Sequence, residues 1–114
     1  MNESITLSKT EILSRAKSKW DGESNANRVR AGSKYQHFID KFKLNVNDWE
    51  NDFERLSKYQ QNLIIKGELI RTYDSLPNSV KTKIMLDFGL SSFSSKWYRM
   101  SSKDKKILLN YVIK

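Results

Sequence analysis

The chain has 114 residues, of which 38% are hydrophobic and 30% are charged, and it contains no cysteine. This length allows one domain with a hydrophobic core and leaves no room for a second. The lack of cysteine excludes disulfides, thiolate metal sites and a cysteine nucleophile. No apolar run is long enough for a transmembrane helix, and residues 1–7 lack the basic start of a signal peptide, so we expect a cytoplasmic protein.

Basic residues outnumber acidic residues by 21 to 13, which gives a net charge of +8. The excess is concentrated at one end of the chain. Residues 77–114 carry eight basic and two acidic residues, residues 35–76 carry six and seven, and residues 1–34 carry seven and four. A basic segment on an otherwise balanced chain favours a polyanionic partner.

The first 32 residues predict one helix followed by a loop. Ser8 and Glu11 have the spacing of a capping box, and apolar residues follow at helical spacing, which predicts a helix over residues 9–20. Residues 21–27 are rich in Gly, Ser and Asn and predict a loop. A short helical turn would follow, and two arginines on it are candidates for a basic surface without the sequence deciding the matter: Arg28 and Arg30.

The rest of the chain predicts two copies of a helical unit of roughly 45 residues, at 33–76 and 77–114. The break at Leu76–Pro77 separates them. Allowing a shortening by two residues in the second copy, the matched positions are Phe42 with Phe88, Leu44 with Leu90, Phe53 with Trp97, Arg55 with Arg99, Leu56 with Met100 and Ser57 with Ser101.

Each copy predicts three helices. In the first copy they start at Ser33, at Asn47 or Asp48, and after the capping box of Ser57 and Gln60, with Trp49, Phe53 and Leu56 buried. In the second copy they cover residues 79–88, residues 92–99, and Ser101 or Ser102 to the C-terminus, with Gly89 ending the first of them. Alternating strand patterns and hairpin turns are missing. We therefore expect a single all-α domain of about six short helices, with an N-terminal helix before two three-helix repeats.

Residues for catalysis or metal binding are scarce. His37 is the only histidine, and the sequence has no phosphate-binding loop and no metalloprotease motif. The acidic run over residues 48–54 fits the positive N-terminal end of a helix better than a cation site. We expect no enzyme activity, no cofactor and no bound metal.

The second copy resembles a DNA-binding helix-turn-helix motif. Its predicted helix, its turn with Gly89 and its next helix are in the right order, and apolar residues stand at four of the usual positions: Ile84, Phe88, Leu90 and Tyr98. Ser95 departs from the motif, because Ile or Val normally stands there.

Helical geometry predicts which residues of this copy would contact DNA. Over residues 92–99, Phe93 and Trp97 fall on one face together with Met100, and this face is expected to be buried. The opposite face and the next helix present hydroxyls and cations, which suit contacts to phosphates and base edges. The candidate DNA-binding residues are Ser94, Ser95, Lys96, Tyr98, Arg99, Lys103 and Lys106.

The equivalent face of the first copy is acidic and would repel DNA. A protein partner is the alternative there, with Glu50, Asp52 and Glu54 as the candidate contact residues. The contrast between the copies is not required by packing.

In its Lys-, Asn-, Ser- and Ile-rich style, the chain resembles small accessory proteins of Gram-positive (staphylococcal-type) phages and phage satellites. The stretches LSKTEILSRAKSKW and KWYRMSSKDKKILLNY carry this resemblance. It implies a regulator, or a small inhibitor that binds one phage or host protein, and it transfers no site residues.

The leading hypothesis is a monomeric or dimeric binding module that contacts double-stranded DNA through its basic second copy, as a regulatory protein of a mobile element. The alternative is an inhibitor that blocks a phage or host protein complex. Membrane association is not expected.

Overall fold

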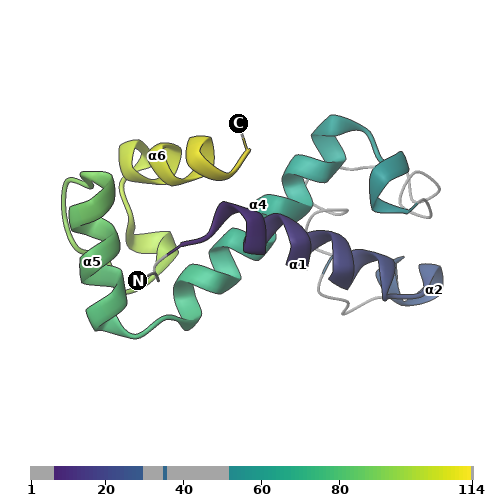
Figure 1. The fold of residues 1–114 in the computed structure, drawn as a ribbon, viewed down its shortest axis with the longest axis horizontal. Helices are drawn as coiled ribbons and strands as arrows, with labels where there is room; N and C mark the ends of the chain where they lie inside the picture. Colours follow the sequence, from purple (N-terminus) through teal and green to yellow (C-terminus); the bar gives the residue numbers. More distant parts are fainter. Residues whose placement is uncertain (1–6, 30–34, 36–51, 114) are drawn as a thin grey trace. The chain divides into compact units, whose positions relative to one another are not determined.

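The computed structural model describes residues 7–29, 35 and 52–113. These residues form α1 (Lys9–Asp21), α2 (Asn25–Val29), the 3-10 helix η2 (Phe53–Arg55), α4 (Lys58–Ser75), α5 (Asn78–Phe88), the 3-10 helix η3 (Trp97–Arg99) and α6 (Ser102–Ile113) (Figure 1). No strand occurs in the described ranges, and the predicted all-α class is confirmed. No helix among these residues combines the length and apolarity needed to cross a membrane.

Part of the predicted architecture lies outside the described residues. This applies to the helix starting at Ser33, the start near Asn47 or Asp48, and the burial of Trp49. The arrangement as two three-helix repeats, with boundaries near residues 32 and 76, therefore stays a prediction.

Serine caps begin α1, α4 and α6. The Ser8 hydroxyl accepts a hydrogen bond from the Glu11 amide at 3.2 Å, so α1 starts where its capping box predicts. At α4 the box is complete, because the Gln60 amide donates to Ser57 Oγ at 3.1 Å and the Ser57 amide donates to Gln60 Oε1 at 3.0 Å. Ser101 caps α6 in the same way, accepting from the Asp104 amide at 3.1 Å.

Gly89 ends α5 as predicted. It adopts the left-handed conformation with φ 67° and ψ 37°, which costs glycine little because it has no Cβ. The Leu90 amide then donates to the Met85 carbonyl at 2.9 Å, which satisfies an acceptor at the end of the helix. The chain turns out of α5 at this point.

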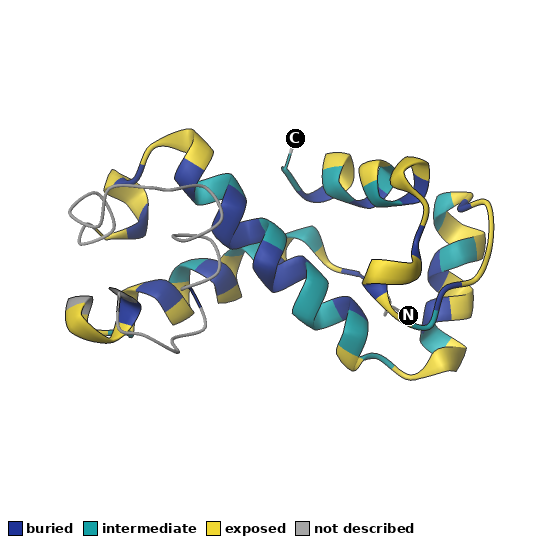
Figure 2. Ribbon diagram, turned by 180° about the vertical axis from the view of Figure 1, so that it is seen from behind, coloured by how far each residue is buried: buried dark blue, intermediate teal, exposed yellow. Residues whose placement is uncertain are grey.

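The chain forms two compact units, residues 14–64 and residues 1–13 with 65–114, and each has its own buried residues (Figure 2). We call the first the N-unit and the second the C-unit.

The N-unit is built around Trp20 at the end of α1. Its indole packs edge-to-face on Tyr35 with ring centroids 4.8 Å apart, and both residues are buried. The guanidinium of Arg28 lies 4.4 Å from the Trp20 ring centroid and donates to the Trp20 carbonyl from Nη2 at 2.8 Å. Arg28 is therefore part of the core and does not join a basic surface, whereas Arg30 lies outside the described residues.

The C-unit is built around Tyr73 near the end of α4. Its ring packs edge-to-face on Trp97 at 6.2 Å, and burial raises the pKa of its hydroxyl, which donates to the Ser94 carbonyl. The ammonium of the buried Lys81 lies 5.5 Å from the same ring and donates to the Ser95 carbonyl at 2.6 Å. This unit also holds a second ring pair, Phe88 with Tyr111 at 5.0 Å.

Candidate nucleic-acid interface

The segment between α5 and α6 contains most of the candidate contact residues, and its structure differs from the prediction. We predicted a helix over residues 92–99, but residues 90–96 are not helical and only Trp97–Arg99 form a single 3-10 turn. The prediction of a recognition helix at this position is wrong.

Tertiary hydrogen bonds explain why the helix does not form. In an α-helix the Trp97 amide would donate within the segment, but here it donates to Asp74 Oδ1 at 2.7 Å. The Ser94 carbonyl accepts a hydrogen bond from the Tyr73 hydroxyl, and the Ser95 carbonyl accepts one from the Lys81 ammonium. The local preference for helix is also weak, because three of the eight residues are serine, whose hydroxyl competes for backbone groups.

The loss of the helix changes which side chains face solvent. Trp97 and Met100 are buried as expected, but Phe93 is 42% exposed, and its predicted place in the core is wrong. Ser94 is buried and Ser95 is half-buried, so the predicted exposed face that joined them to Tyr98 and Arg99 does not exist.

Five of the seven candidate residues are exposed: Lys96, Tyr98, Arg99, Lys103 and Lys106. We call these five residues the basic surface. They lie within eleven consecutive residues, on η3, on its N-terminal flank and on the first turns of α6. Among the described residues, no ion pair involves any of them.

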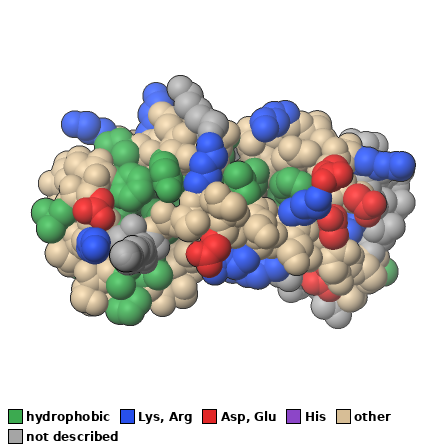
Figure 3. All heavy atoms as spheres, in the orientation of Figure 1, with side chains coloured by type: hydrophobic (Ala, Val, Ile, Leu, Met, Phe, Trp, Pro, Cys, Tyr) green, Lys and Arg blue, Asp and Glu red, His purple; other side chains and the backbone are tan. Residues whose placement is uncertain are grey.

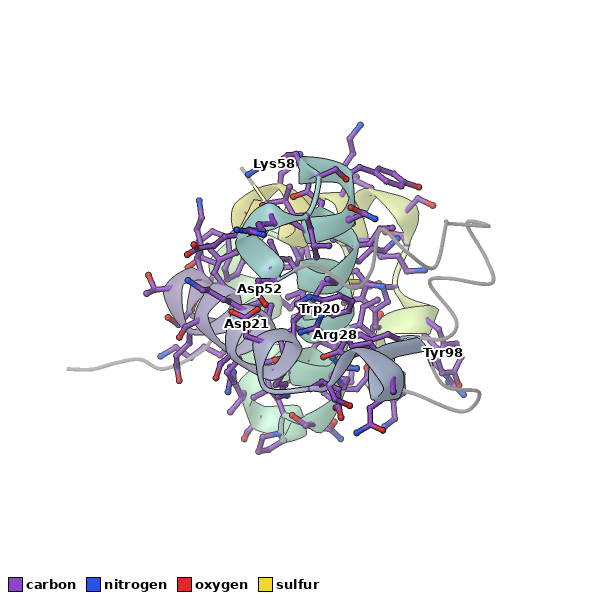
Figure 4. The ribbon with its side chains drawn as sticks, turned by 90° about the vertical axis from the view of Figure 1, so that its right-hand side faces the viewer. Trp20, Asp21, Arg28, Asp52, Lys58 and Tyr98 are labelled. Carbon is purple, nitrogen blue, oxygen red and sulfur yellow. The ribbon has the colours of Figure 1, made fainter. Side chains whose placement is uncertain are left out.

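Tyr98 and Arg99 contact one another on this surface. Arg99 Nε donates to the Tyr98 hydroxyl at 3.3 Å, and the guanidinium carbon lies 5.7 Å from the ring centroid. The hydrogen bond to Tyr98 raises the pKa of Arg99, and the side chain stays charged throughout the accessible pH range. Tyr98 projects away from the ribbon (Figure 4).

The carboxylate within the basic surface is turned inward. Asp104 stands between Lys103 and Lys106 in sequence but is fully buried, where Oδ1 accepts from the Ser91 amide and Oδ2 from the Ser91 hydroxyl, both at 2.9 Å. Burial alone would raise the pKa of Asp104, but these hydrogen bonds and one from the Ser92 amide together lower it. The lysines are exposed and the acid is buried, so this stretch of α6 presents positive charge to solvent.

The acidic candidates lie in the N-unit. Asp52 and Glu54 are exposed on and beside η2, whereas Glu50 lies outside the described residues. Glu54 forms an ion pair with Lys17 of α1, so part of its charge is already neutralised.

Figure 3 shows acidic side chains gathered near η2, and apolar side chains over α5 and α6 with lysines and arginines at the margins.

Sequence reasoning missed the residues that hold this surface in place. Tyr73, Asp74 and Lys81 fix the segment before η3, as described above, and none of them was singled out. A signal was present, because an aromatic residue, an aspartate and a cation recur at the same spacing in Trp20, Asp21 and Arg28.

In the described part of the chain, no three His, Cys, Asp or Glu side chains come together in a way that could hold a metal ion. His37 lies outside that part. Comparisons with protein-family models, with curated proteins and with solved structures found no match to this chain.

Proposed function

We propose that this chain is a non-enzymatic module that binds nucleic acid through the basic surface. The observation that carries the proposal is the placement of charge along η3 and α6: Lys96, Arg99, Lys103 and Lys106 face solvent while Asp104 is buried. Four of the basic residues behind the sequence excess in the second copy are thus at the surface, whereas Lys81 is buried. The resemblance in style to phage accessory proteins fits a regulatory role, which is part of the same proposal.

Phosphate contacts by these cations would dominate affinity. Each cation that neutralises a phosphate releases condensed counterions, and the binding constant then falls as salt rises. Four such contacts to duplex DNA give an expected log–log salt slope of about −3 to −4. Duplex DNA is the first ligand to test, because it has the highest density of phosphate.

The test compares two double variants that remove the same charge. Lys103→Gln with Lys106→Gln alters the basic surface, and Arg55→Gln with Lys58→Gln alters exposed residues of the N-unit. We expect the first pair to flatten the salt slope by about two units and the second pair to leave it unchanged. Fluorescence anisotropy at several salt concentrations measures this, and equal flattening by both pairs would show that only net charge matters.

No binding of the wild-type chain to any nucleic acid at about 50 mM salt, with its helical circular dichroism intact, would refute the proposal. Unchanged affinity of both double variants at every salt concentration would also refute it, because the basic surface would then make no contact.

A protein partner is the second candidate, and exposed apolar residues of the C-unit favour it. Leu86 on α5 is 70% exposed and Phe93 is 42% exposed. Exposed apolar side chains of this size mark protein-binding sites where they form a contiguous patch. Pull-down of this chain with its bound partners from phage-infected and uninfected bacterial cells, with nuclease treatment, separates the two candidates. A partner that is retained after nuclease and lost in a Leu86→Lys, Phe93→Lys variant would support the protein-binding hypothesis.

A further inference from the structure

We infer that Tyr98 is a stacking platform for an unpaired base, and that the ligand of the basic surface is a single strand and not a duplex. This inference rests on the proposed function and narrows it to one class of nucleic acid. It follows from the geometry of η3, from the Tyr98–Arg99 pair and from the loss of the predicted helix.

The turn that carries Tyr98 is anchored on the inside and open on the outside. Trp97, the residue before Tyr98, is 5% exposed, and Met100, two residues after Tyr98, is 4% exposed. Tyr98 itself is 69% exposed. Three hydrogen bonds hold the backbone of the turn. The Trp97 amide donates to the Asp74 carboxylate, the Arg99 amide donates to the Lys96 carbonyl at 3.1 Å, and the Met100 amide donates to the Trp97 carbonyl at 3.0 Å. The tyrosine ring is therefore presented from a fixed backbone, which lowers the entropy cost of binding against it.

The chemistry of the pair suits a nucleobase. An exposed aromatic ring stacks on any base, because every base has a π-face, and the planar guanidinium of an arginine stacks in the same way. Arg99 lies over the Tyr98 ring and also occupies its hydroxyl. The pair thus offers flat surfaces and a positive charge at one place, while Lys96 and Lys103 on either side in sequence are placed to follow the phosphates of a strand.

The same geometry disfavours a duplex. Sequence in a duplex is read in the major groove by a helix or a two-stranded ribbon, and residues 92–99 supply only one 3-10 turn. Bases inside a duplex are already stacked on their neighbours, so an exposed tyrosine gains no base contact without unstacking them. An unpaired strand has free base faces at no such cost.

The N-unit provides an internal comparison. Its 3-10 turn η2 has Glu54 where η3 has Tyr98, and Glu54 is paired with Lys17. A carboxylate at this position repels a strand and offers no ring. The exposed tyrosine is thus specific to the C-unit turn and is not a general requirement of the turn itself.

The experiment uses the full chain with a labelled oligothymidine of about ten nucleotides and a duplex of the same length, within the site sizes seen for single-strand binders. Anisotropy should show tighter binding to the single strand at equal salt. Tyr98→Ala should weaken single-strand binding about 5- to 100-fold, as expected for the loss of one stacked base, and Tyr98→Phe should leave it within about twofold. Duplex affinity should stay within about twofold in both variants.

Tyr59→Ala is the matched control, because Tyr59 is an exposed tyrosine at the start of α4. It should leave single-strand binding unchanged. An oligouridine strand distinguishes RNA from DNA as the source of the unpaired bases. An iodouracil-substituted strand should crosslink to Tyr98, and a crosslink found only at other residues would overturn the inference.

Two further outcomes separate the inference from the proposed function. Duplex binding as tight as single-strand binding, with Tyr98→Ala neutral, overturns the inference and leaves the proposed function standing. No binding to either form overturns both and leaves a protein partner. Melting of Tyr98→Ala at the wild-type temperature shows that the fold is intact, as the exposure of the ring leads us to expect.

Discussion

The N-unit and the C-unit use the same contacts to hold a 3-10 turn. In the N-unit, Asp21 at the end of α1 accepts the Phe53 amide at 2.9 Å, and in the C-unit, Asp74 near the end of α4 accepts the Trp97 amide at 2.7 Å. A buried aromatic residue precedes each aspartate, and a buried cation lies over its ring, as Figure 4 shows for Trp20 and Arg28. The contact set is duplicated even though its residue types differ.

The difference in chain length between the two sets shows what the contacts require. Asp21 and Phe53 are 32 residues apart, whereas Asp74 and Trp97 are 23 apart, so the first set encloses nine more residues. The same anchors close loops of both lengths. This agrees with the weak dependence of loop-closure entropy on length. The turn therefore requires the contact residues at the helix ends and not a loop of fixed length.

The outward residues of the two turns differ in charge while the inward residues do not differ in role. Phe53 and Trp97 are both buried, and Leu56 and Met100 close the two turns with similar extended backbone angles. Outside, the N-unit has Glu54 paired with Lys17 and the C-unit has Tyr98 with Arg99. Surface chemistry can therefore change in either unit at little cost to packing.

The largest effect is expected from the inward aromatic residues. Trp97→Ala and Phe53→Ala remove buried side chains and leave cavities, and each should lower the free energy of unfolding by about 3–5 kcal/mol. That loss is a large part of the stability of an ordinary small domain, which is about 5–15 kcal/mol. Urea denaturation followed by circular dichroism measures it. If Trp97→Ala unfolds at the same urea concentration as the parent, Trp97 is not an anchor and the comparison of the two turns fails.

The next effect concerns the two aspartates. Asp74→Ala removes a charged acceptor from the buried start of η3 and should cost about 1.5–3 kcal/mol, the usual range for a hydrogen bond to a charged group. Asp21→Ala should cost less, because Asp21 is exposed and water can replace it. Urea denaturation of both variants under the same conditions measures the two losses of unfolding free energy. A larger loss for Asp21 would show that the two contact sets are not equivalent.

The sequence was sufficient for the features that depend on neighbours along the chain. The capping boxes of Ser8 and Ser57 set the starts of α1 and α4, and Gly89 ends α5, because each of these acts through residues a few positions away. The burial of Phe53 and Trp97 also followed from the alignment of the two copies.

The features that depend on distant partners were not predictable from local pattern. The periodicity of Phe93, Trp97 and Met100 is compatible with a helix. The helix is prevented by side chains of α4 and α5 that form hydrogen bonds with the backbone of residues 94–97. The burial of Asp104 has the same origin, since its partner Ser91 is 13 residues away. In the candidate surface, the cations are exposed as expected, but the predicted exposure of the serines depended on a helix that does not form.

Acid should weaken the capping position of the C-unit and leave its N-unit counterpart unaffected. Asp104 has the neutral Gln60 as its counterpart at the start of α4, and only Asp104 can titrate. The pKa of Asp104 is lowered on folding, so its stabilisation is present above about pH 4 and is lost as pH falls toward the folded pKa. Melting temperature should therefore fall more steeply below pH 4 in the wild type than in Asp104→Asn. Asp87→Asn, at an exposed aspartate of the same unit, should keep the wild-type slope; equal slopes for the wild type and Asp104→Asn would contradict the assignment.

The smallest effect is expected from the outward pair of the N-unit. Glu54→Tyr introduces the residue that the C-unit has at this position and breaks the ion pair with Lys17, which lies on the surface and is screened by salt. Any loss in melting temperature should be close to experimental error and should vanish at high salt. The variant should also gain no affinity for a single strand, because Asp52 beside the turn is acidic and Tyr59, at the position equivalent to Lys103, carries no charge. A loss that persists at high salt would show that Glu54 takes part in packing, and a gain in strand binding would show that one exposed tyrosine is sufficient without the surrounding lysines.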